Sequence, residues 1–188
     1  MMAGIMFRKS WQIQLIVWCC LSVLAGVAFY DWYQTPGGHR DFYHMLELNP
    51  YTARFNLLIS LCTLVYFLLF RREIARVGRS EAEYYALLFL ILCGSFLLST
   101  YSNLLIFFLG IEILSIPQYI LAGSDKENIK SNEASLKYFL MGSFGTGILL
   151  MGITLLYGAT GSFDIFSPTF LAQFQHSGAI SSMAVSGI

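Results

Sequence analysis

The stretch Leu104–Ala122, LLIFFLGIEILSIPQYILA, decides the fold class of this chain. As a helix rising 1.5 Å per residue, it is long enough to cross a hydrocarbon core of about 30 Å. Its only formal charge is Glu112, near the centre. A carboxylate at that depth costs roughly 2.5–3.5 kcal/mol on insertion scales, so it normally faces protein or a water-filled cavity and marks a function. The stretch therefore predicts a membrane helix with a functional carboxylate at mid-depth.

Three residues of the same stretch qualify the role of Glu112. Ser115 and Tyr119 follow it at i+3 and i+7, on the same helical face, within reach of a hydrogen bond to the carboxylate. Pro117 has no backbone N–H and frees the carbonyl of Ile113 for water or a neighbouring side chain. Two interpretations follow. Glu112 is a titrating group in an ion path, which we favour, or a structural carboxylate held by Ser115, Tyr119 or another helix.

Composition places the whole chain in the membrane class. Of its 188 residues 56% are hydrophobic and 12% are charged, whereas soluble domains carry about 25% charged residues. The formal net charge is zero, which provides no basic face for nucleic acid. We predict one all-α membrane domain over residues 1–188, a polytopic bundle with five spans at about 11–30, 55–70, 84–100, 104–122 and 136–157.

The segments between the spans predict how the spans run. Tyr101-Ser102-Asn103 form a tight turn, which sends the span 104–122 back antiparallel beside the span before it. Residues 71–83 are a mixed charged connector, and the glycines at 158 and 161 bound a turn that ends the fifth span.

The C-terminal residues predict a surface helix and then the beginning of a further span. Residues 164–175 have the pattern of a short amphipathic surface helix. The apolar run 180–188 is too short to cross a bilayer, which needs about 20 residues. We interpret it as the start of a sixth span in a partial sequence.

Lysine and arginine are concentrated on one side of the predicted bundle. Nine fall on the side of the N-terminus, and the other side has only Arg40 and Arg54. By the positive-inside rule the N-terminus, the 71–83 connector and the 123–135 loop are cytoplasmic. Because no transit peptide is evident, we expect a bacterial inner (plasma) membrane.

Three sets of residues are interpreted as structural. The cysteines have no disulfide or metal spacing and are expected to be small buried hydrophobes: Cys19, Cys20, Cys62 and Cys93. A polar loop with a Pro-Gly-Gly turn fits no metal-ligand motif and is expected to be solvated: His39, Asp41, His44 and Glu47. Small residues of the fifth span are expected to permit close helix contact: Gly142, Gly145, Gly147 and Gly152.

A pair of opposite charges lies at the start of the fifth span. Ser131 or Asn132 is expected to cap this helix, with Glu133 in the first turn, where the helix dipole favours a negative charge. Lys137 follows four residues later, in the favourable order for an ion pair. The pair is either an interface anchor, with Lys137 reaching the headgroups, or a proton-entry pair at the cytoplasmic face.

Two motifs of the chain resemble a known family, subunit N of the proton-translocating NADH:quinone oxidoreductase, respiratory complex I. The run FLGIEILSIP (108–117), followed by Tyr119, looks like the fifth transmembrane helix of that subunit. The run SNEASLKYF (131–139) looks like the start of its sixth helix, and LYGATG (156–161) also fits. Ile113 and Ile116 replace leucines that are common in the motif, a mild apolar change.

The resemblance implies an antiporter-like fold of about fourteen helices with inverted repeats, of which the five spans would be helices two to six. It implies a translocase subunit that couples quinone reduction to proton transfer, with Glu112 as the midplane carrier and Glu133 and Lys137 at the entrance. The partners in this family are other membrane subunits of complex I and the lipid bilayer, and quinone and NADH are handled by partner subunits, so no cofactor is expected here. The lysine that pairs there with the matching glutamate lies on a later helix, outside this sequence.

Two other functions remain as alternatives. The chain is a subunit of a multi-subunit cation/proton antiporter or a membrane-bound hydrogenase, whose core motifs overlap with these. Alternatively it is a non-transporting structural membrane protein, in which case Glu112 should be replaceable by glutamine without loss.

Overall fold

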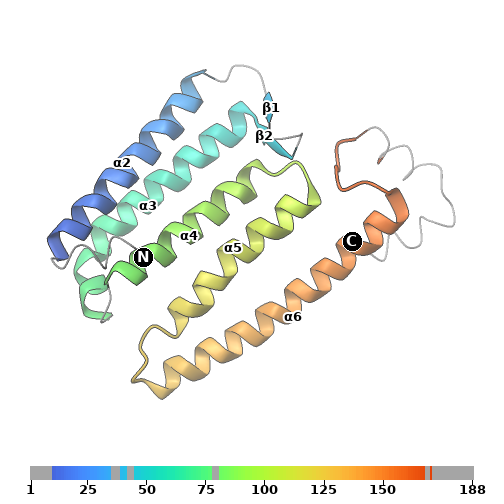
Figure 1. Ribbon diagram of the computed structural model, residues 1–188. Coiled ribbons are helices and arrows are strands. Elements are labelled where there is room, and N and C mark those ends of the chain that lie inside the picture. The colour runs from blue at the N-terminus through green and yellow to red at the C-terminus, as the bar shows by residue number, and fades with distance from the viewer. Residues whose placement is uncertain (1–9, 35–38, 42–44, 78–80, 168–169, 171–188) are drawn as a thin grey trace.

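Five long helices make up most of the part of the chain that the computed structural model describes, residues 10–34, 39–41, 45–77, 81–167 and 170. Each is long and apolar enough to cross a membrane. In chain order they are α2 (Ser10–Gln34), α3 (Pro50–Val77), α4 (Glu81–Thr100), α5 (Leu104–Ala122) and α6 (Ile129–Thr160). Successive helices run in opposite directions and lie beside one another in sequence order (Figure 1). The predicted all-α polytopic bundle is confirmed.

α4 and α5 form the closest helix pair, joined by the predicted turn. Asn103 caps α5, its side-chain oxygen accepting from the backbone N–H of Leu105 at 2.9 Å. A Cβ added at Gly94 would lie 2.7 Å from the backbone nitrogen of Leu114, so only glycine permits this approach. The bounds of α5 are those predicted for the fourth span.

The helices extend further beyond the apolar spans than predicted. α3 continues to Val77 and α4 begins at Glu81, so most of the charged segment 71–83 that connects the two spans is helical. Charged residues such as arginine and glutamate are good helix formers, and only the hydrocarbon excludes them. Hydropathy therefore predicts the bounds of the membrane span but not the bounds of the helix that contains it.

The N-terminal cap of α6 also differs from the prediction. The cap is Asn128, whose side-chain oxygen accepts from the N–H of Lys130 at 3.0 Å. The helix therefore begins before Ser131 and Asn132, and Glu133 lies beyond its first turn. At the other end, Gly161 adopts φ 66°, in the left-handed region that favours glycine, and terminates the helix as expected.

The end of the bundle that holds the α4–α5 turn is closed by two extended segments. Strands β1 (His39–Asp41) and β2 (Leu46–Leu48) pair antiparallel, and β2 also bridges to Tyr101 (Figure 1). On the other side of the turn, Leu104 N–H donates to the carbonyl of Phe163 at 3.0 Å, and Asn103 bridges to Asp164. Of the predicted helix 164–175, the described residues up to 167 form a bridge and a turn; most of the rest, and the run 180–188, lie outside the described residues.

The buried core lies between α2, α3 and α4. It contains Val17 and Leu21 of α2, Phe67 of α3, and Tyr85 and Leu92 of α4, with the rings of Phe67 and Tyr85 stacked at 5.6 Å.

The four cysteines are free and exposed on helix faces, so the prediction that they are buried is wrong within this chain. Lipid tails are as apolar as the side chains themselves, and an apolar residue of a membrane helix therefore gains little by facing inward.

Candidate functional site on α5 and α6

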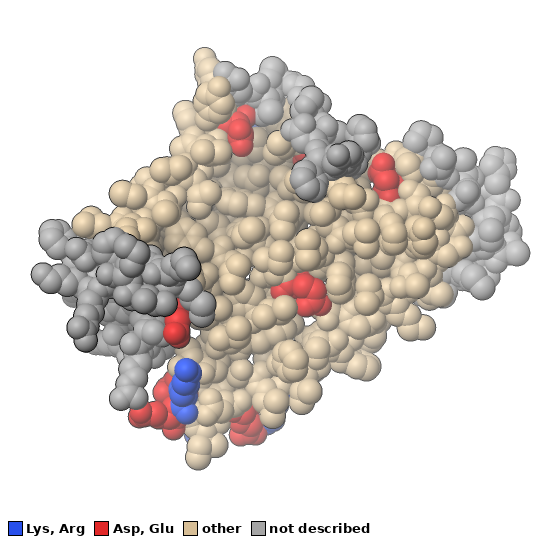
Figure 2. Space-filling view, in the orientation of Figure 1, with Lys and Arg blue, Asp and Glu red and all other residues tan. Residues whose placement is uncertain are grey.

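Glu112 lies half-buried in the middle of α5. Every other charged residue of the five helices lies in the first or last third of its helix, whereas Glu112 lies in the middle third of α5. Figure 2 shows one patch of acidic atoms in the middle of the face, and the other charged atoms that are visible lie toward its edges. Within the described part of the chain, no hydrogen bond or ion pair holds the carboxylate of Glu112.

Ser115 and Tyr119 are buried and do not hydrogen-bond Glu112. The single hydroxyl proton of Ser115 is donated to the carbonyl of Ile111, one turn back in the same helix. The Tyr119 ring packs edge-on against the rings of Tyr138 and Phe139 of α6, with centroids 4.8 and 5.8 Å apart. The interpretation of Glu112 as a carboxylate held by these two hydroxyls therefore has no support in the geometry.

Pro117 is buried inside α5, and the helix continues through it to Ala122. Because proline has no N–H, the carbonyl of Ile113 lacks its intrahelical donor, as predicted from the sequence. This carbonyl belongs to the residue that directly follows Glu112, so a free acceptor lies close to the carboxylate on the helix.

The last four carbonyls of α5 all receive hydrogen bonds, two of them from side chains of α6. Ser135 Oγ donates to the Tyr119 carbonyl at 2.7 Å, and Ser131 Oγ donates to the Ala122 carbonyl at 2.8 Å. The backbone N–H groups of Gly123 and Ser124 donate to the carbonyls of Ile120 and Leu121. Ser131, predicted to cap its own helix, thus caps the end of α5, where four carbonyls lack intrahelical partners.

Small residues of α6 face this end of α5. A Cβ at Gly142 would overlap the Tyr119 hydroxyl, whereas nothing lies within 4 Å of a Cβ at Gly145 or Gly147. The prediction of close helix contact is therefore confirmed at Gly142 and wrong, within this chain, at Gly145 and Gly147. Sequence reasoning missed Ser135, although the serine and glycine stripe at positions 131, 135 and 142 is a pattern that favours close helix contact.

Glu133 and Lys137 form an ion pair on the surface of α6, with Lys137 Nζ 2.5 Å from Glu133 Oε1. The side chains are 58% and 71% exposed, so this pair stabilises the helix by only about 0.3–0.5 kcal/mol. The neighbouring Tyr138 donates a hydrogen bond to Gln118, six residues from Glu112 or about 9 Å along the axis. The structure therefore does not bring the pair into contact with Glu112.

The charged end of the bundle holds this pair. In Figure 2 the visible lysine and arginine atoms lie at the lower left, the end at which α6 begins.

His44 of the polar loop lies outside the described residues. Among the residues that are described, no group of three or more His, Cys, Asp or Glu side chains is arranged to hold a metal ion.

Comparison with known proteins agrees with this arrangement. Residues 101–187, which contain α5 and α6, match the family described as "NADH:quinone oxidoreductase/Mrp antiporter, TM". Over 154 residues the chain is 44% identical to NADH-quinone oxidoreductase subunit N of Cytophaga hutchinsonii, a match that covers 80% of this chain and 33% of that protein. Over most of its length the chain is similar to subunit N. It spans about a third of the length of the curated relatives it matches.

The fold of this chain is that of antiporter-like membrane subunits. A chain of respiratory complex I from Thermus thermophilus superimposes with a TM-score of 0.71 at 25% identity, covering 94% of this chain and 36% of that one. A chain of the archaeal membrane-bound sulfane sulfur reductase superimposes with a TM-score of 0.77 at 23% identity, covering 95% and 37%. The resemblance and the antiporter-like fold predicted from the sequence are confirmed, and the chain is an integral membrane protein.

Proposed function

We propose that this chain is part of a proton-translocating, antiporter-like subunit of an NADH:quinone oxidoreductase, in which Glu112 takes up and releases a proton within the membrane. One observation carries the proposal: a half-buried carboxylate in the middle of α5 has no fixed partner among the described residues. A structural carboxylate at that depth needs donors that hold it, because an unpaired charge in the membrane is expensive. A carboxylate without them is free to titrate.

The protonation of such a group follows its surroundings. Burial favours the neutral acid, and an approaching cation favours the carboxylate. A cation that moves relative to Glu112 therefore drives proton uptake and release. In the family that the motifs resemble, this cation is a lysine on a later helix, and we propose the same arrangement for the whole protein.

The surroundings of Glu112 leave room for water or for such a partner. The close contacts between α5 and α6 lie between residues 118–123 and 131–142. Continuing this antiparallel register brings Gly145 and Gly147 to about the level of Glu112, where they meet nothing within 4 Å. The free Ile113 carbonyl adds an acceptor on the same helix.

Glu133 and Lys137 are proposed as the entrance to this path. They lie, exposed and paired, in the first part of α6, at the end that carries most of the lysines and arginines. By the positive-inside rule that end, with the N-terminus, faces the cytoplasm of a bacterial inner membrane. We propose that Ser115, Pro117 and Tyr119 shape the surroundings of Glu112. The proposed partners are other membrane subunits of the same complex. The flavin, iron–sulfur and nicotinamide groups are proposed to belong to partner subunits.

A second candidate is a related antiporter-like subunit of a different complex. The likeness to the sulfane sulfur reductase chain favours it, because the fold alone is found in more than one respiratory membrane complex. The 44% identity to a subunit N over most of this chain favours the first candidate.

The test is Glu112→Gln in the assembled complex, reconstituted in vesicles, with proton pumping and NADH-driven quinone reduction measured on the same preparation. Glutamine keeps the shape and removes the titration, so pumping should fall markedly and coupled quinone reduction with it. Glu127→Gln, on the exposed loop before α6, is the matched control and should leave both rates unchanged. Pumping by Glu112→Gln at the wild-type rate would exclude the proton-carrier role and support the structural alternative.

A further inference from the structure

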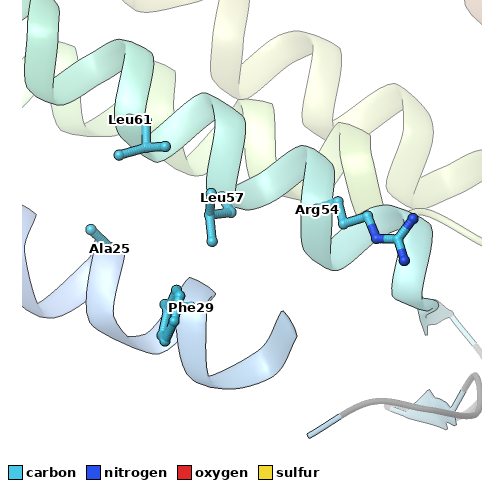
Figure 3. Close-up of a pocket in the computed structure, with 5 residues that line it drawn as sticks. All are labelled: Ala25, Phe29, Arg54, Leu57 and Leu61. Atoms are coloured by element: carbon cyan, nitrogen blue, oxygen red, sulfur yellow. The ribbon is translucent and has the colours of Figure 1, made fainter. Parts of the chain in front are cut away.

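A groove of about 460 Å³ runs between α2 and α3, on the side of the bundle away from α6. It is lined by Ala25 and Phe29 of α2 and by Arg54, Leu57 and Leu61 of α3 (Figure 3). The α2 residues are spaced at i and i+4 and the α3 residues at i, i+3 and i+7, so each set occupies one helix face. Among the residues that the structure describes, the lining of the groove is therefore apolar along its length and carries a single charge, at one end.

Arg54 supplies that charge and is exposed near the start of α3. It forms no hydrogen bond or ion pair with the residues that the structure describes. In Figure 3 its guanidinium extends away from Leu57 and Leu61, toward the beginning of the helix, while its aliphatic stem borders the groove. This is the geometry of a side chain that keeps its stem in an apolar layer and its charge at the interface.

We propose that this groove binds an anionic glycerophospholipid, with its phosphate on Arg54 and one acyl chain against Phe29, Leu57 and Leu61. The planar guanidinium matches a phosphate with two parallel hydrogen bonds. Leu61 lies about 10 Å from Arg54 along the helix axis. A chain that starts at the Arg54 guanidinium and follows the leucines therefore runs parallel to the spans, as acyl chains do in a bilayer.

The charge decides which lipid is bound. Acyl chains gain little by leaving other lipid for an apolar groove, since both surroundings are equally apolar. Selectivity must therefore come from the headgroup at Arg54, and a lipid with net negative charge is preferred over a zwitterionic one, whose choline already neutralises the phosphate. The start of α3 lies at the end of the bundle opposite the start of α6, so the lipid belongs to the leaflet away from most lysines and arginines.

A second groove of the same chain provides a comparison for the role of the charge. This groove of about 490 Å³ has no charged residue among the described residues that line it, which are Cys19, Cys20, Val23, Leu24 and Phe89. The described lining is apolar, so nothing in it distinguishes one headgroup from another. No described residue in the lining of either groove belongs to the α5–α6 site, so lipid binding is tested independently of proton transfer.

The test uses the full-length protein in its assembled complex, reconstituted into phosphatidylcholine vesicles with a trace of photoactivatable lipid. One preparation contains phosphatidylglycerol with a diazirine in its acyl chain, and the other contains phosphatidylcholine with the same chain. After illumination, peptide mass spectrometry measures labelling of residues 25–29 and 57–61. The variants are Arg54→Gln, Arg54→Lys and Leu57→Trp, with Lys126→Gln and Leu24→Trp as controls at the opposite end and in the uncharged groove.

In the wild type, phosphatidylglycerol should label the groove about fivefold more than phosphatidylcholine, the ratio expected for one basic group near the membrane surface. Arg54→Gln should reduce the ratio to one, Arg54→Lys should retain most of it, and Lys126→Gln should leave it unchanged. Leu57→Trp fills the groove and should remove labelling by both lipids, whereas Leu24→Trp should not. Equal labelling by both lipids in the wild type, or a preference that survives Arg54→Gln, overturns the proposal. Absence of labelling by both overturns it as well, because a protein segment then covers the groove.

Discussion

Tyr119 of α5 lies directly over Gly142 of α6, so closely that no Cβ fits at position 142. Tyr119 is only 8% exposed and is flanked edge-on by the rings of Tyr138 and Phe139, which restrict its movement. The same residue receives the Ser135 hydrogen bond on its carbonyl. Because Tyr119 lies two helical turns from Glu112, this contact sets how far α6 stands from the candidate proton carrier.

Gly142→Ala should destabilise the protein by about 1–3 kcal/mol, the usual cost of overpacking a well-packed contact. Thermal unfolding of the purified complex measures it. Gly145→Ala is the matched control, since its Cβ meets nothing within 4 Å, and it should be neutral or stabilising by up to about 1 kcal/mol. Adding Tyr119→Phe to Gly142→Ala should recover part of the loss, because it removes the overlapping hydroxyl. Equal effects of the two alanines would contradict this description of the interface.

Gly94→Ala should be more severe than Gly142→Ala. Its Cβ would lie 2.7 Å from the backbone nitrogen of Leu114, and a backbone atom cannot rotate away as a side-chain tip can. α4 and α5 must then separate, so little of the variant should reach the assembled complex. Native gel analysis of membranes measures assembly, with Gly26→Ala, whose Cβ has nothing within 4 Å, as the control. Normal assembly of Gly94→Ala would show that the two helices are not this close.

Ser131→Ala and Ser135→Ala should each cost about 1–2 kcal/mol, because each leaves a terminal carbonyl of α5 without its donor. Denaturant or thermal unfolding of the complex provides the measurement. Ser124→Ala retains the backbone N–H that serves the Leu121 carbonyl and should be close to neutral. If the three variants are equally stable, water replaces the serines and they do not hold the helices together.

Two variants distinguish the proton-entrance role of the Glu133–Lys137 pair from a helix-anchoring role. Lys137→Ala should lower proton pumping partially while changing stability by no more than about 0.5 kcal/mol, the usual contribution of an exposed i,i+4 pair. Exchanging the two residues, Glu133→Lys with Lys137→Glu, restores an ion pair but reverses its direction. Pumping that remains low in the exchanged variant supports the entrance role. Pumping restored to the wild-type rate assigns the pair to anchoring the helix.

Local sequence was sufficient wherever one segment decides its own structure. The bounds of α5 follow from an apolar run that Asn103 opens, and the 101–103 turn forces α4 and α5 to be antiparallel. The mid-depth position of Glu112 and the resemblance to subunit N are equally local, since they depend on residue order alone. Helix ends beyond the hydrocarbon were misplaced, as at Val77 and Ile129, because polar residues continue a helix as readily as they end it.

Which faces of the helices meet was decided only by the tertiary structure. Hydropathy does not distinguish a lipid-facing side from a buried one, and the exposed cysteines illustrate this. For the same reason, the sequence alone did not predict that Ser131 caps α5, that Tyr119 covers Gly142 or that Arg54 ends an apolar groove. Each of these contacts joins residues of different helices, and their geometry exists only once the helices have packed.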